Sequence, residues 1–165
     1  MIEFDFNPNR ESFTDKGKRP AGGREAGIAE FYPGDAWVDW VSFSTYNRGF
    51  LRDNDQRVHT FAEDLRTVYG IMDRVAGPSV RFSISETSTT DQGGLDKKQW
   101  FGDLLKSIET EFTRIGIVNF FLIDKHNEGE KPALWGLHGP GEHAMLKQLL
   151  ADFRVRMGMP VPPKF

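Results

Sequence analysis

Apolar and polar residues change their spacing along the chain, from the two-residue period of strands to the longer period of helices. Between Ile2 and Asn7 apolar side chains alternate with acidic and amide side chains, and Pro8 follows. This alternation predicts a first strand. The stretch "AWVDWVSFSTYN", residues 36–47, is rich in aromatic and β-branched residues and predicts a second strand.

The remainder of the chain alternates between helix and strand patterns. Apolar residues at helical spacing predict an amphipathic helix over residues 60–76, closed by Gly77-Pro78. The later predicted elements are a strand over 79–86, a helix over 97–112, a strand over 115–124 and a helix over 141–158. The strand "IGIVNFFLID" is nearly continuous in apolar residues, which predicts that both of its faces are covered. Alternating strands and helices predict an α/β fold with a parallel sheet.

Length and charge narrow the class of protein. The 165 residues predict a single domain, residues 1–165, with a long flexible loop over the polar, Gly-rich residues 9–27. The net charge of −3 argues against a nucleic-acid partner, since phosphates require a basic face. Absence of cysteine excludes disulfides and thiolate sites. No apolar run predicts a membrane span, and no export signal is visible at the N-terminus.

Polar side chains follow three of the predicted strands. Glu86 ends the third strand, Tyr46 and Asn47 end the second, and Asp124 and His126, with Asn127 beside them, end the fourth. Ligands of parallel α/β folds bind at the carboxyl ends of strands, so we expect these groups to line one cleft. A carboxylate in such a cleft suits glycosidic bond cleavage, where one carboxylate attacks the sugar and another donates a proton.

Each of these residues also has a purely structural interpretation. Glu86 would equally suit a solvated loop, and Tyr46-Asn47 would suit a turn. A solvated His126 is the better interpretation of that histidine, and most tryptophans of the chain belong to cores. Trp135, in the loop "KPALWGLHG", is the exception that suits sugar stacking. Spacing of the acidic and histidine residues matches no metal pattern, and no cofactor is expected.

The segment "EFYPGDAWVDWVSFSTYN" resembles the sixth strand and its approach in the family 26 glycoside hydrolases, best known as β-mannanases. "VRFSISETS" is similar to the seventh strand of that family, "KKQWFGDLLKSI" to the helix after it, and "IGIVNFFLID" to the eighth strand. "IEFDFNPNR" would correspond to the fifth. The resemblance implies a partial TIM barrel, strands 5–8 of a (β/α)8 fold with their helices.

The resemblance also implies roles for individual residues. Glu86 becomes the nucleophile of a retaining hydrolase, Tyr46 the residue that orients it, and Trp135 a sugar-stacking side chain, with Asn47, Asp124 and His126 nearby. The family's proton donor, a glutamate in a His-Glu pair on strand four, has no counterpart in this sequence. Glu3 and Asp5 are poor replacements, since both lie early in their strand.

Two functions therefore remain open. One is a glycoside hydrolase acting on a β-linked polysaccharide such as mannan, whose acid/base comes from outside this chain. The other is a non-catalytic carbohydrate-binding or assembly subunit derived from such a barrel. A half-barrel leaves open sheet edges, which predicts one of three arrangements. A homodimer or a partner chain completes the barrel, or the chain is a truncated or decayed piece of a longer enzyme. The resemblance implies a secreted or periplasmic location.

Overall fold

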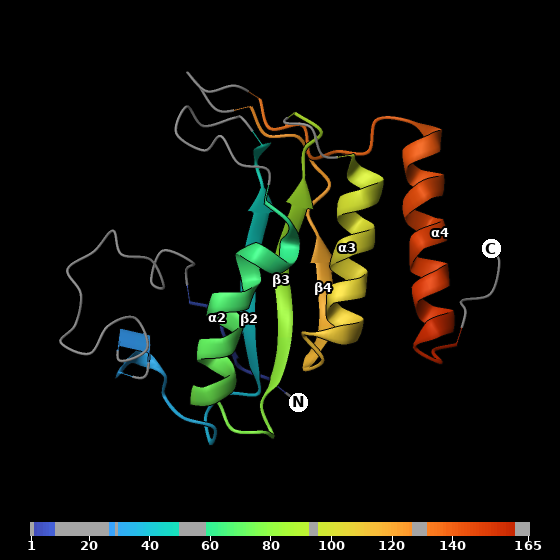
Figure 1. Ribbon diagram of the computed structural model, residues 1–165. Coiled ribbons are helices and arrows are strands. Elements are labelled where there is room, and N and C mark those ends of the chain that lie inside the picture. Colours follow the sequence, from blue (N-terminus) through green and yellow to red (C-terminus); the bar gives the residue numbers. More distant parts are fainter. Residues whose placement is uncertain are drawn as a thin grey trace. The chain divides into compact units, whose positions relative to one another are not determined.

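The computed structural model describes residues 2–8, 27–28, 30–49, 59–92, 96–126 and 132–160 of the chain. The strands in these ranges are β1 (Asp5–Phe6), β2 (Trp40–Asn47), β3 (Arg81–Thr89) and β4 (Ile115–Phe120). The helices are α2 (Phe61–Val75), α3 (Lys97–Thr110) and α4 (Pro140–Arg156) (Figure 1). Almost all of the loop predicted over residues 9–27 lies outside the described residues. No described helix has the length and apolar character needed to cross a bilayer.

The strands form one parallel sheet in the order β1-β2-β3-β4. β1 pairs with β2 in parallel, and β3 pairs with β4 in the same way. Between β2 and β3, Arg81 N donates to Asp39 O (3.1 Å) and Thr90 N donates to Asn47 O (3.2 Å). Both partners advance together along the chain, so these strands are also parallel, as their arrowheads show (Figure 1). The α/β class and the parallel sheet predicted from the sequence are confirmed.

The chain forms two compact units. The first comprises Met1–Tyr46, Glu63–Thr87 and Arg114–Phe120, and so contains nearly all of the sheet and of α2. The second comprises Asn47–Ala62, Ser88–Thr113 and Phe121–Phe165, and so contains α3 and α4.

In the first unit, α2 packs on one face of the sheet. Val41 and Phe43 of β2 alternate onto this face, and both are buried. Tyr69 of α2 packs edge-on against Phe82 of β3, with ring centroids 5.3 Å apart. Burial of such large side chains is the main stabilising term for the unit. The apolar stripe predicted for this helix is confirmed, with these members buried: Leu65, Val68 and Met72 of the first unit and Phe61 of the second.

In the second unit, α3 and α4 pack side by side (Figure 1). Helix α3 begins at Lys97 because the side chain of Asp96 caps it, accepting from Lys98 N at 2.7 Å. Its apolar stripe is buried along its whole length, and Trp100 meets the ring of Phe61 edge-on at 6.0 Å. At the carboxyl end of α4, Arg156 Nε donates to Glu109 Oε2 near the end of α3, at 2.9 Å.

All four predicted strands differ from the structure in their bounds. β1 is shorter than predicted, β3 continues past Glu86 to Thr89, and β4 ends at Phe120. The second strand starts at Trp40 and not at residue 36, because Gly34 has a φ of +98° and residues 35–37 form a turn. The prediction that the fourth strand is covered on both faces is wrong. β4 is an edge strand, and Ile117 is 42% exposed. A continuous apolar run marks a strand, but burial depends on what packs against each face.

We expect opposite effects from adding a methyl group at two glycines of the first unit. A Cβ at Gly77 would overlap Asp35 Oδ2, whose carboxylate accepts from Gly77 N with both oxygens at 3.1 Å. Gly77→Ala should lower the free energy of unfolding by about 1–3 kcal/mol, because it displaces this acceptor.

The matched control is Gly70→Ala within α2, where the added Cβ would meet only Arg74 Nη1 at 3.6 Å. This change should raise the free energy of unfolding by about 0.5–1 kcal/mol, the helix preference of Ala over Gly. Urea unfolding followed by circular dichroism measures both. Equal effects of the two variants would contradict the role assigned to Asp35.

Candidate functional site

Two of the predicted site residues, Tyr46 and Glu86, meet at the carboxyl ends of neighbouring strands in the first unit. The phenol of Tyr46 donates to Glu86 Oε2 at 2.5 Å. A phenol to carboxylate bond of this length is strong, because the acceptor carries a charge. Glu86 itself is exposed, and the printed bond engages Oε2 and not Oε1. The pair is therefore a positioned carboxylate with one oxygen fixed.

The bond exists because β3 breaks its own alternation. Phe82 and Ile84 of β3 are fully buried on the face that packs against α2. Regular two-residue alternation would place Glu86 on that face as well. The pairing of β3 with β4 shifts register between Ile84 and Thr87, which marks a bulge. Glu86 consequently meets Tyr46, which alternation along β2 places on the opposite face. Bulges next to functional sites commonly redirect a side chain in this way.

Ser85 fixes the chain at the bulge. Its hydroxyl donates to Phe43 O at 3.1 Å, accepts from Asn7 Nδ2 at 3.0 Å, and lies 3.0 Å from Ser44 Oγ. These bonds connect β3 to both β1 and β2 directly beside Glu86. Neither Ser85 nor Asn7 stands out in the sequence, since their importance depends on the register between strands.

The face of β1, β2 and β3 opposite α2 carries mainly polar side chains, and we call it the polar face. Ser42 Oγ donates to Asp5 Oδ2 at 2.5 Å, and nearer the amino end Arg81 Nη2 donates to Glu3 Oε1 at 2.7 Å. The polar face thus holds side-chain bonds at several levels from the start of the strands to Tyr46 and Glu86. The polar face consists of Glu3, Asp5, Asn7, Trp40, Ser42, Ser44, Tyr46, Arg81, Ser85 and Glu86.

Asn47 belongs to the second unit and has a turn role there. It is buried, with Nδ2 donating to Thr89 Oγ1 at 2.9 Å. Its Oδ1 accepts from Gly49 N at 3.3 Å, and Gly49 has a φ of +55°. An Asn side chain that bonds the backbone two residues later is typical of a turn. This is the structural interpretation that the sequence left open for Asn47. Its amide is engaged in these bonds.

Asp124, also of the second unit, holds the loop after it. Its Oδ1 accepts from Gly136 N at 2.7 Å, and its Oδ2 lies 3.4 Å from His138 Nε2. A Cβ at Gly136 would stand 2.9 Å from Asp124 Oδ1, so this close approach requires glycine. The sequence analysis did not single out His138. Its position two residues after Gly136, in the loop that Asp124 holds, is the feature that could have indicated it. His126 is exposed, and Asn127 lies outside the described residues.

Trp135 is buried, with 2% of its surface exposed. Within the second unit its ring meets Phe121 edge-on at 5.8 Å, and the Arg48 guanidinium lies 5.5 Å from the ring centroid. Lys125 Nζ lies 5.8 Å from the same centroid. The ring is surrounded by protein atoms in this structure, and two cations of the chain lie near it.

A buried lysine fixes the same loop to α3. Lys97 is 3% exposed, and its Nζ donates to Gly136 O at 2.5 Å. The carboxylate of Glu142 lies 3.5 Å from this Nζ and also accepts from His138 N at 2.8 Å. Lys97 therefore places its ammonium group between a buried loop carbonyl, to which it donates, and a partly buried carboxylate, whose charge it balances. Within the described ranges no group of three or more acidic or histidine side chains is placed to hold a metal ion.

No model of a known protein family matches the chain, and no curated protein matches it either.

We expect Lys97→Met to lower the free energy of unfolding by about 2 kcal/mol, because it leaves Gly136 O and Glu142 without their cation while keeping the side-chain length. The matched control is Lys98→Met, at the neighbouring exposed position. It should change the free energy of unfolding by less than about 0.5 kcal/mol. Chemical denaturation measures both values. A Lys97→Met protein as stable as the Lys98→Met protein would show that the buried cation does not stabilise this loop.

Proposed function

We propose that the chain is a glycoside-hydrolase-like protein whose Glu86 is the nucleophile in retaining cleavage of a β-linked polysaccharide such as mannan. In this proposal the parallel sheet is the second half of a (β/α)8 barrel of the family 26 type. The observation that carries it is the bond of 2.5 Å between Tyr46 and Glu86 at the carboxyl edge of the sheet. The bulge in β3 adds support, because it turns the carboxylate onto the polar face beside Tyr46.

The chemistry follows from the state of the two carboxylate oxygens. Tyr46 holds Oε2, so Oε1 attacks the anomeric carbon as the bond from that carbon to the leaving oxygen breaks. An acid supplied from outside this chain protonates the leaving oxygen. Water then attacks the same carbon, gives its proton to the conjugate base of that acid, and frees Glu86 with net retention of configuration. No metal or cofactor takes part in these steps.

A second candidate, carbohydrate binding without cleavage, is favoured by one observation. The hydrogen bond that positions Glu86 comes from a phenol and not from a second carboxyl group. Retaining cleavage of an unactivated glycoside needs two carboxyl groups about 5 Å apart. The chain by itself would then hold a glycan on the polar face without cleaving it.

Aryl glycosides with an acidic leaving group test the first candidate, because such a group departs without a proton donor. The chain should hydrolyse 2,4-dinitrophenyl β-mannobioside yet leave mannan intact. Glu86→Gln should lower the rate by about 10³-fold or more, and Tyr46→Phe by about 10²-fold, because the carboxylate loses its orientation. Release of dinitrophenolate, followed by absorbance, measures all three.

Asp91→Asn is the matched control, since it removes one exposed carboxylate that has no part in the site, and it should keep the parent rate. Hydrolysis that survives Glu86→Gln unchanged would exclude the proposed nucleophile. Binding of manno-oligosaccharides by calorimetry without any dinitrophenolate release would favour the second candidate, and neither binding nor release would exclude both.

A further inference from the structure

The side chain of Asn7 crosses the polar face from the end of β1 to β3, and it reaches the residue next to Glu86. Asn7 Nδ2 donates to Ser85 Oγ at 3.0 Å, and Ser85 directly precedes Glu86 in the chain. Two strands with a third between them lie about 9.5 Å apart in a flat sheet. Two short side chains bridge that distance only where the sheet curves toward the side on which they lie. The polar face is therefore the inner side of a curved sheet at Asn7 and Ser85.

The hydrogen bonds of Ser85 leave two acceptor atoms beside it. A serine hydroxyl donates one hydrogen bond and accepts two. Ser85 Oγ donates to Phe43 O and accepts from Asn7 Nδ2, so the contact of 3.0 Å with Ser44 Oγ uses the proton of Ser44. Ser44 Oγ and Asn7 Oδ1 then remain as acceptors, and no described residue donates a hydrogen bond to either of them. Asn7 is also exposed, so a ligand in solution has access to it.

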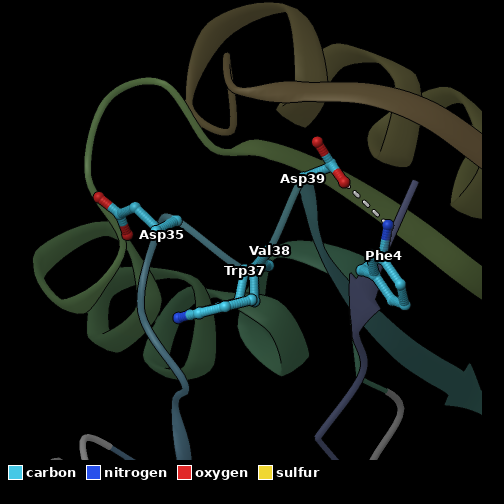
Figure 2. A pocket seen from close by; sticks show the side chains of 6 residues that line it. Phe4, Asp35, Trp37, Val38 and Asp39 are labelled. Atoms are coloured by element: carbon cyan, nitrogen blue, oxygen red, sulfur yellow. Dashed lines mark hydrogen bonds between the residues drawn. The ribbon is translucent and has the colours of Figure 1, made fainter. Parts of the chain in front are cut away.

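The segment that carries Asn7 is held in place on both sides of this residue. On the amino side, Asp39 Oδ2 accepts from Phe4 N at 2.9 Å, as the dashed line in Figure 2 shows, and Asp39 N donates to Phe4 O at 2.9 Å. On the carboxyl side, Pro8 restricts the backbone of Asn7 to extended conformations. The bond to Ser85 fixes the amide group itself. Groups that are fixed in advance lose little conformational entropy when a ligand binds to them.

The two acceptors lie one step of side-chain alternation away from the nucleophile proposed above. Ser44 precedes Tyr46 by two residues on β2, a separation of about 7 Å along a strand. The phenol of Tyr46 holds Glu86, so the acceptors lie toward the amino end of the strands from that carboxylate. A sugar ring with its anomeric carbon at Glu86 extends over a comparable distance and carries several hydroxyl groups. Such hydroxyls are the donors that Asn7 Oδ1 and Ser44 Oγ lack.

We propose that Asn7 is a specificity-determining residue, whose Oδ1, together with Ser44 Oγ, accepts a hydrogen bond from a hydroxyl group of the sugar that Glu86 attacks. The inference rests on the function proposed for Glu86 and adds the group that recognises the substrate. A site that accepts a hydrogen bond from a substrate hydroxyl discriminates against an analogue without that hydroxyl, because its acceptor is then left unpaired.

Removal of the acceptor and of the hydroxyl, separately and together, tests the proposal. The substrates are 2,4-dinitrophenyl β-mannobioside and three analogues that lack the hydroxyl at carbon 2, 3 or 6 of the mannose next to the leaving group. Asn7→Ala should lower kcat/KM about tenfold on the complete sugar, the effect of one lost hydrogen bond. On the analogue without the partner hydroxyl it should lower kcat/KM by less than about twofold, because that bond is already absent. Asn7→Asp keeps an oxygen at this position and should again distinguish the complete sugar from that analogue.

The matched control is Gln99→Ala, which removes an exposed amide side chain of α3 in the second unit and should keep the parent values on all four substrates. An equal loss on all four substrates in Asn7→Ala would show that Asn7 only supports the fold. That result, or a parent-like Asn7→Ala, would overturn this inference and leave Glu86 as the nucleophile. A parent chain that releases no dinitrophenolate, or a Glu86→Gln chain that still releases it, would overturn the proposed function and this inference with it.

Discussion

The bond between Tyr46 and Glu86 depends on one local break in the regular geometry of β3. Side chains of a strand alternate between two faces, and Phe82 and Ile84 use that alternation to face α2. The shift of register after Ile84 turns Glu86 onto the other face, where the phenol of Tyr46 holds it at 2.5 Å. The bulge therefore turns an ordinary strand of a packed sheet into the carrier of a positioned and accessible carboxylate.

The two faces of the sheet consequently have different tasks. The face toward α2 is apolar and supplies the core of the first unit through residues such as Phe43 and Phe82, which pack against Tyr69 of α2. The polar face gains little from burial and is organised by side-chain hydrogen bonds between strands. β1 is only two residues long, yet Asn7 reaches Ser85 at 3.0 Å and Glu3 reaches Arg81 at 2.7 Å. Side chains therefore add to the few backbone bonds that join this short strand to the sheet.

The sequence predicted the elements well, because their periodicity is local. The stripe of α2, the positions of α3 and α4 and the parallel sheet followed from the spacing of apolar residues and from the alternation of strands and helices. The sequence predicted that the third strand ends at Glu86, whereas β3 continues to Thr89 and Glu86 lies inside it. The face of the sheet on which Glu86 lies could not be predicted in the same way. Alternation places Glu86 on the wrong face, and only the pairing of β3 with β4 reveals the bulge.

The burial of individual side chains and their hydrogen-bond partners could not be predicted from the sequence either. Trp135 is a residue type that suits sugar stacking, but Phe121 packs against it within the second unit and only 2% of its surface is exposed. Trp37, grouped with core tryptophans, is 72% exposed. Asn47 ends β2 as predicted, whereas Asp124 lies four residues after the end of β4. Each accepts a hydrogen bond from a glycine backbone. Whether a residue after a strand serves chemistry or a turn depends on distant partners, which one sequence does not show.

Trapping of the covalent intermediate tests the role of Glu86 most directly. Incubation with 2-deoxy-2-fluoro-β-mannosyl fluoride needs no proton donor, since fluoride leaves unaided, and the fluorine at carbon 2 slows release of the sugar. Mass spectrometry of the intact chain and of its peptides should then show one added fluoromannosyl group, located on Glu86. An unmodified chain, or a sugar attached to any other residue, would contradict the account.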